Sequence, residues 1–126
     1  IVPIDLRRAQ EKYPALIQDS TLITKIIDIE KTINGRAYYY IPKEKVLPFA
    51  GQIKTGDIIL ITTKKKGLDT AHVGIAIENE GQIYLLHASV SDKKVSVTTE
   101  TLPDYLQRIT SHSGIMIGRL INFKSN

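Results

Sequence analysis

The sequence predicts an α+β fold in which amino-terminal helices precede a mostly antiparallel sheet with one late helix. Apolar residues recur at three- and four-residue spacing between residues 21 and 34, which is typical of one face of a helix. From residue 58 onward, short β-branched runs alternate with turn residues, which is typical of strands joined by tight turns. We therefore expect the helices first and the sheet after them.

The amino-terminal part is predicted to hold two helices. Residues Leu6–Leu16 can form a short helix that ends near Pro14. The pair Asp19-Ser20 then offers an N-cap for a longer helix over Thr21–Asn34. Gly35 follows this helix directly, so we expect it to end the helix in the left-handed conformation.

The rest of the chain is predicted to form strands around one helix. Residues Arg36–Ile41 include three consecutive tyrosines and predict a short strand that Pro42 stops. The continuous apolar run Ile58–Thr63 predicts a buried strand. Thr101 can cap a helix that runs to about residue 110, with Asp104 placed as in a capping box. The other predicted elements are a helical turn and four strands: Pro42–Phe49, His72–Glu78, Gln82–Ala88, Lys94–Thr99 and Ile115–Ile121.

Length and composition limit the classes of function. The 126 residues suffice for one domain or part of one, and the start at Ile1 rather than methionine indicates a processed or trimmed chain. The sequence contains no cysteine, so it can supply no disulfide, thiolate metal site or thiol nucleophile of its own. No run approaches the ~20 apolar residues that span a bilayer. The net charge of +4 is spread out without interleaved aromatic residues, so nucleic acid is not an expected partner.

Two histidines are predicted to face each other across a hairpin. If Asn79-Glu80 forms a two-residue turn, Glu78 pairs with Gly81 and His72 lies directly opposite His87. Directly opposed side chains have Cβ atoms roughly 5 Å apart, a distance that suits a hydrogen bond between two imidazoles. A register shift of one residue would place the two rings on opposite faces.

The alternation along the first of these strands predicts two unlike faces. Gly74 and Ala76 share the face of His72, whereas Val73, Ile75 and Ile77 point the other way. We expect the large apolar side chains to face the core. Small residues beside a polar group would let another backbone, such as a nucleophile-bearing helix, approach the histidines.

Other interpretations of the histidines stay open at this point. A strand histidine is commonly structural. A zinc site is a second possibility, since neutral imidazoles are good ligands, with Asp69 and His112 as candidates for a third ligand. Neither has a recognised spacing, so we expect no metal and no cofactor. His112 lies in a polar loop and is predicted to be solvated.

Several motifs resemble a known family in both order and spacing. Gly56-Asp57-Ile58-Ile59, His72-Val73-Gly74-Ile75-Ala76 and Leu86-His87-Ala88-Ser89 resemble the NlpC-type superfamily of papain-like cell-wall hydrolases. Three more segments resemble one branch of it, associated with N-acetylmuramoyl-L-alanine amidase activity: Tyr39-Tyr40-Ile41-Pro42, Gly67-Leu68-Asp69 and Thr101-Leu102-Pro103-Asp104-Tyr105-Leu106. The resemblance extends from about residue 13 to residue 120.

The resemblance implies a papain-like fold and a Cys–His–His mechanism. By motif, His72 matches the base that takes the thiol proton, and His87 matches the residue that orients its imidazole. Muropeptides would be the substrate, the bond cleaved would join the lactyl group to L-alanine, and the bacterial periplasm or envelope would be the location. Asp69, Ser89 and Tyr40 are our candidates for substrate binding, although a turn aspartate, a hairpin serine and a strand tyrosine are alternative roles.

The family's cysteine has no counterpart in this chain. It lies at the start of a helix before the matched region, so we expect residues 1–126 to be the carboxyl-terminal portion of one cysteine amidase domain. The partner would then be the chain's own amino-terminal half, and the chain alone would be inactive. The alternative is a catalytically inactive relative that binds muropeptides or a protein.

Overall fold

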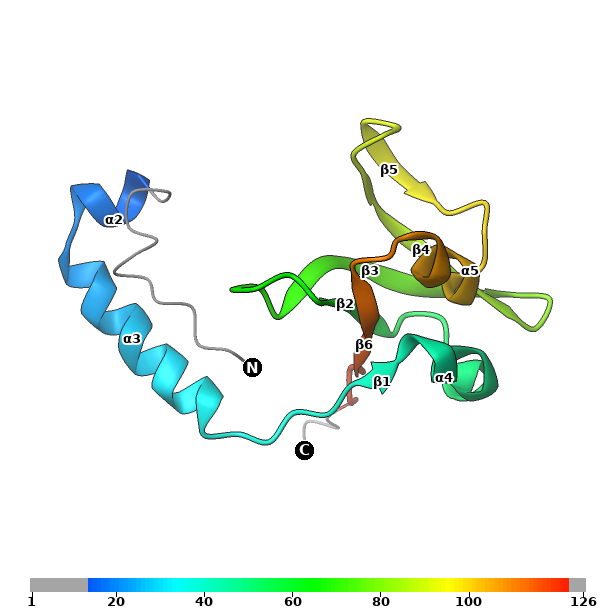
Figure 1. Cartoon of the computed structure of the whole chain (residues 1–126), viewed down its shortest axis with the longest axis horizontal. Helices are drawn as coiled ribbons and strands as arrows, with labels where there is room; N and C mark the ends of the chain where they lie inside the picture. The colour runs from blue at the N-terminus through cyan, green and yellow to red at the C-terminus, as the bar shows by residue number, and fades with distance from the viewer. Residues whose placement is uncertain (1–13, 123–126) are drawn as a thin grey trace. The chain divides into compact units, whose positions relative to one another are not determined.

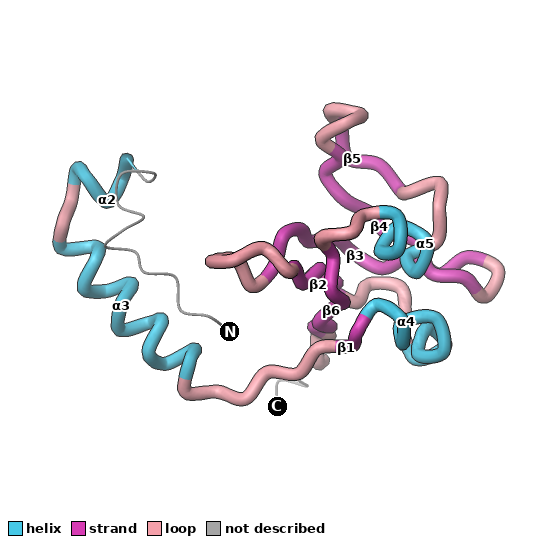
Figure 2. The backbone as a smooth tube through the Cα atoms, viewed as in Figure 1, coloured by secondary structure: helices cyan, strands magenta, loops and turns pink. Residues whose placement is uncertain are grey.

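The computed structural model describes residues 14–122, which form two compact units. One unit contains the helices α2 (Pro14–Gln18) and α3 (Thr21–Asn34), and the other contains the sheet (Figures 1 and 2). The expected α+β class is confirmed. Most of the helix predicted over Leu6–Leu16 lies outside the described residues. Pro14 begins a helix rather than ending one, as suits a residue without a backbone N–H at a first turn.

The longer helix α3 has the predicted bounds, and its start is capped by one of the two expected residues. Asp19 Oδ1 accepts hydrogen bonds from the Thr21 N–H at 3.0 Å and the Thr21 hydroxyl at 2.6 Å, whereas Ser20 caps nothing with its side chain. The prediction for Gly35 was wrong, because its φ of −73° is right-handed. Its N–H continues the helical pattern by donating to the Lys31 carbonyl at 3.1 Å.

The second unit is a six-stranded antiparallel sheet with the order β1-β6-β2-β3-β4-β5. Helices α4 and α5 pack on one of its faces, and a short 3-10 turn, η2, follows α4. The bounds are β1 Ile41–Pro42, α4 Lys43–Phe49, η2 Ala50–Gln52, β2 Ile58–Thr63, β3 Thr70–Asn79, β4 Gln82–Ser89, β5 Lys94–Val97, α5 Leu102–Arg108 and β6 His112–Gly118. Thr101 caps α5 as predicted, since its hydroxyl accepts a hydrogen bond from the Asp104 N–H.

The core lies between this sheet and the two helices. Alternate residues of the central strands point inward and meet apolar side chains of α4 and α5. The side chains that are almost fully buried are Ile59, Ile61, Leu85, Leu102, Leu106, Ile115 and Val46. Burying one such side chain contributes roughly 1.5–3 kcal/mol to folding, which makes this layer the main source of stability in the unit.

The predicted faces of β3 are reversed. Gly74 and Ala76 are buried, whereas Val73 is 52% and Ile75 42% exposed. The small residues face the core because Leu85 of β4 fills the space over Gly74, where a Cβ would lie 2.5 Å from its Cδ1 atom. The outer face of the sheet is therefore apolar and exposed.

The predicted hairpin register was wrong by two residues. Asn79 pairs with Gln82, so Glu80 and Gly81 form the turn. Both have positive φ, 51° and 77°, as a type I′ turn requires. A shift of two keeps His72 and His87 on the same face of the sheet, which a shift of one would not.

The tyrosine run does not form the predicted strand, since β1 contains only Ile41 and Pro42. Tyr39 is 86% exposed and Tyr40 54%, so these rings lie outside the core. The strand is short because β1 pairs with β6 only at two positions, Ile41 with Ile115 and Pro42 with Gly114.

An ion pair between the buried Asp57 and the half-exposed Arg119 joins the residue before β2 to the residue after β6. Asp57 accepts hydrogen bonds from Arg119 Nε at 2.7 Å and Nη2 at 2.6 Å, and from the Lys54 N–H at 2.8 Å. The guanidinium holds the pKa of the Asp57 carboxyl below its usual range. Asp57 thus stabilises the turn before β2 and also anchors the chain after β6.

We expect Gly114→Ala to destabilise the sheet by roughly 2 kcal/mol or more. A Cβ at Gly114 would overlap the Ile41 carbonyl oxygen, so β1 would have to move away. Urea denaturation measures the loss. Gly118→Ala is the control in the same strand, because a Cβ there would make an ordinary 3.6 Å contact with Ile58. Equal stability of the two variants would contradict this account of β1.

Candidate active site

The two predicted histidines are hydrogen-bonded to each other. Nε2 of His72 lies 2.7 Å from Nδ1 of His87. The ring centroids are 5.0 Å apart and the ring planes meet at 85°, so one ring presents its edge to the other. Because Nε2 of His72 is used in this contact, its Nδ1 is the nitrogen that is left for another partner.

The strands bring these rings together diagonally rather than directly. His72 pairs with Ile61 of β2, and on the other side of β3 the register runs from Ile75 opposite Leu86 to Asn79 opposite Gln82. Continuing this register places His87 opposite Gly74, two residues along from His72 and on the same face. Diagonal neighbours in a sheet lie within reach of ring side chains. Gly74 itself is covered by the Leu85 side chain rather than by either ring.

Burial and charge keep the His72 imidazole neutral. The pKa of His72 is lowered from 6.5, first because burial penalises the charged ring and second because His87 repels a positive charge. A neutral imidazole can accept a proton at neutral pH, which a general base must do.

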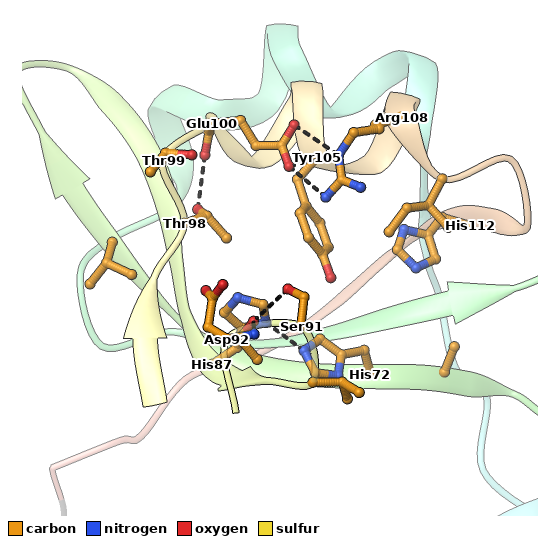
Figure 3. Close-up of a pocket in the computed structure, with 15 residues that line it drawn as sticks. His72, His87, Ser91, Asp92, Thr98, Thr99, Glu100, Tyr105, Arg108 and His112 are labelled. Carbon is orange, nitrogen blue, oxygen red and sulfur yellow. Dashed lines mark hydrogen bonds and ion pairs between the residues drawn. The ribbon is translucent and has the colours of Figure 1, made fainter. Parts of the chain in front are cut away.

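The pair lies in a pocket of about 520 Å³ (Figure 3). Strands β3 and β4 form its floor, and the segment after β5, helix α5 and the start of β6 form its walls. Most of the side chains that line it are polar: His72, His87, Ser89, Ser91, Asp92, Thr98, Thr99, Glu100, Tyr105, Arg108 and His112. A pocket of this size can hold part of a saccharide or a short peptide.

Of the three predicted substrate-binding residues, the pocket includes one. Ser89 lines it and is 8% exposed. Its hydroxyl contacts Ser91 Oγ at 3.1 Å and accepts from the Asp92 N–H at 3.2 Å, so it also holds the turn after β4. Tyr40 and Asp69 are not among the lining residues, and their role in substrate binding stays a prediction.

The prediction that His112 is solvated was wrong. His112 begins β6, is 4% exposed and lines the pocket. Its pKa is lowered, mainly by burial and then by the charge of His72. The strand starts three residues before the predicted Ile115. The Ser111 carbonyl accepts a hydrogen bond from the Lys64 N–H at 2.8 Å, which extends the pairing between β2 and β6.

Tyr105 is a pocket residue to which we assigned no role from the sequence alone. It lies on the buried face of α5 between Leu102 and Leu106, and this spacing could have predicted that it faces the sheet. Its ring lies 5.7 Å from the His87 ring and 5.6 Å from the His112 ring, measured between centroids. The rings of His72, His87, Tyr105 and His112 are therefore linked in this order by ring contacts along the pocket.

An ion pair balances the charge at the pocket rim. Arg108 donates to Glu100 from Nε at 2.9 Å and from Nη2 at 2.7 Å. The guanidinium also lies 5.4 Å from the centre of the Tyr105 ring. The charges of Arg108 and Glu100 therefore offset each other. Within residues 14–122, no three histidine, aspartate or glutamate side chains gather in a group that could hold a metal ion.

The family follows from a comparison of the whole chain with family models. Residues 3–115 match the AmiA-like model, described as N-acetylmuramoyl-L-alanine amidase-like. The chain belongs to this family. No curated protein matches this amidase-like chain.

Three solved structures are similar to this amidase-like chain. An N-acetylmuramoyl-L-alanine amidase from Bacteroides uniformis has 36% identity and a TM-score of 0.77 over 92% of this chain and 50% of that one. A Bacteroides fragilis protein named as a candidate xylanase has 37% identity and a TM-score of 0.74 over 90% and 50% of the two chains. A Legionella pneumophila protein with 23% identity and a TM-score of 0.53 over 75% and 38% shares the fold alone. The amidase-like chain thus spans about half the length of the Bacteroides proteins.

We expect the free energy of unfolding to fall as the pH drops below 6.5. His72 and His112 have a lowered pKa in the folded chain, so the unfolded chain binds more protons in this range. Their contribution is complete above pH 6.5 and is lost as the pH falls through the folded values. Urea midpoints at about pH 8 and about pH 5 measure the loss.

The variant His112→Gln removes one of the two titrating rings and is expected to show a smaller loss over the same pH range. A midpoint that stays constant or rises as the pH falls would show that these imidazoles are not held neutral by burial.

Proposed function

We propose that this chain carries the base and the orienting residue of a cysteine-type N-acetylmuramoyl-L-alanine amidase that cleaves bacterial peptidoglycan. The observation that carries the proposal is the 2.7 Å contact between His72 and His87 at the floor of a polar pocket, in a chain of the amidase-like family. In this proposal His72 takes the proton of a thiol, and His87 fixes the orientation and tautomer of its ring.

The proposed roles specify which nitrogens carry protons. To act as a base, His72 needs a free lone pair on Nδ1, so its proton lies on Nε2 and is donated to Nδ1 of His87. When His72 becomes an imidazolium, the same hydrogen bond becomes charge-assisted and therefore stronger. This is how an orienting residue favours proton transfer without itself taking the proton.

The proposed reaction has two stages. A cysteine thiol gives its proton to His72, and the thiolate attacks the carbonyl carbon between the lactyl group and L-alanine. His72 returns the proton to the alanine nitrogen, which leaves as an amine, and a lactyl thioester forms. Water then attacks the thioester with His72 as base, releasing the lactyl carboxylate and restoring the thiol.

The thiol must come from outside the given sequence, which contains no cysteine. We propose that residues 1–126 are the carboxyl-terminal portion of a papain-like domain of the NlpC type. Two observations support this: the chain spans about half of the Bacteroides amidase, and apolar side chains such as Val73 and Ile75 are exposed on the outer face of its sheet. The proposed partner is the amino-terminal half of the same domain.

The absence of cysteine also favours a second candidate function, a catalytically inactive relative that binds muropeptides or a protein. The pocket would then hold a muropeptide without cleaving it. The two candidates differ in the gene product, which in the first case contains a thiol that the reaction requires.

A xylanase function has less support from the pocket. Glycoside hydrolysis uses a pair of carboxyl groups on either side of the scissile bond. The pocket is lined by Asp92 and Glu100, and Glu100 is held by Arg108 in an ion pair at 2.7 Å. A hydrogen-bonded pair of imidazoles suits acyl transfer instead.

A cell-wall substrate implies a location in the bacterial periplasm or envelope, and we propose this location for the protein. No helix in the described part of the chain is long and apolar enough to cross a membrane.

We expect the pure 126-residue chain to release no peptide from muropeptides. The complete gene product should release peptides that begin with L-alanine, and His72→Ala should lower this rate by roughly 100-fold or more. Chromatography of the products measures both. Release by the isolated chain would contradict the thiol mechanism, and a gene product without thiol-dependent release would favour the binding function.

A further inference from the structure

The wall of the pocket carries a tyrosine and a histidine that the proposed reaction does not use. Tyr105 is 8% and His112 4% exposed, and both rings line the pocket that holds the histidine pair. Figure 3 shows the Tyr105 hydroxyl pointing toward the space beside His72 and His87, with the His112 ring next to it. Both polar groups thus lie beside the proposed reaction centre.

The two nitrogens of His112 differ in their surroundings. Within the described part of the chain, Nδ1 is the one buried side-chain polar atom without a hydrogen-bond partner. An N–H group without an acceptor is costly to bury and is rarer in proteins than an unused acceptor. The proton therefore belongs on Nε2, the ring nitrogen that can reach the pocket. His112 then offers the pocket one neutral N–H donor.

The Tyr105 hydroxyl offers a second neutral donor. It forms no hydrogen bond with residues 14–122, and burial raises the pKa of the phenol, which keeps it protonated. Its removal should therefore leave intramolecular hydrogen bonds intact. The nearby Arg108 is engaged by Glu100 through two of its nitrogens, so it does not compete for a neutral ligand group.

We infer that Tyr105 and His112 together bind the carbonyl oxygen of the amide that joins the lactyl group to L-alanine. This inference rests on the proposed function. A carbonyl oxygen has two lone pairs and can accept from both donors at once. The oxygen gains negative charge when a thiolate attacks, so two fixed donors beside the base would stabilise the transition state more than the substrate.

The test measures binding by the complete gene product, with its cysteine changed to alanine so that the probe is not cleaved. The probes are N-acetylmuramoyl-L-alanine, which contains the amide, and N-acetylglucosamine, which shares the sugar but has no lactyl group and so lacks this carbonyl oxygen. Tyr105→Phe and His112→Leu should each weaken binding of the first probe roughly 3- to 10-fold, as expected for one lost hydrogen bond. Binding of the second probe should not change. His112→Gln keeps an N–H donor and should restore part of the affinity.

Two controls separate binding from structure. Tyr84→Phe is the matched change away from this pocket, where the Tyr84 hydroxyl donates to Gln82 at 3.0 Å, and it should not alter affinity. Urea denaturation of Tyr105→Phe should match the unchanged chain, whereas a purely structural role would shift the midpoint.

Each outcome is decisive. Wild-type affinity in both Tyr105→Phe and His112→Leu would overturn the inference and leave the proposed function standing. Equal weakening for both probes would overturn it too, because the pair would then contact the sugar. If the complete gene product, otherwise unchanged, binds neither probe, the proposed muropeptide site fails and the inference fails with it.

Discussion

The candidate site depends on one hydrogen bond between two imidazoles at the end of the sheet's core face. For His72 and His87 to meet, β3 and β4 must pair in a register that keeps both rings on one face. The turn at Glu80-Gly81 sets that register, since both residues adopt the positive φ that joins twisted antiparallel strands. A short local feature, eight residues from His72, therefore fixes a contact between side chains fifteen positions apart.

Periodicity was sufficient to predict the elements, but it could not decide which side of the sheet would be covered. The helix over Thr21–Asn34, the strand over Ile58–Thr63 and the cap at Thr101 follow from spacing within each segment, and all three are present. The faces of β3 were assigned wrongly because large apolar residues were taken to point inward. The covered face is set by α4 and α5, and their packing depends on contacts between segments distant in sequence.

Local spacing does not show how distant segments pack, and this explains which residues of the site could be predicted from the sequence. His72 and His87 lie on one face of the sheet, and alternation together with a two-residue turn was enough to predict that they meet. Tyr105 and His112 reach the pocket only through the packing of α5 and the early start of β6, which no local pattern of polar residues reveals. Around the pair, these residues create a wall of neutral donors, with the Glu100–Arg108 ion pair at the rim. A neutral amide fits this wall better than a charged group.

The central claim is that His72 donates from Nε2 to Nδ1 of His87 and keeps its own Nδ1 free as a base. Nitrogen-15 NMR of the labelled chain at neutral pH tests this directly, because a hydrogen bond between two nitrogens transmits a measurable scalar coupling. The account predicts a coupling between these two nitrogens, with the proton attached to His72. A proton on Nδ1 of His72, or the absence of any coupling between the rings, would contradict it.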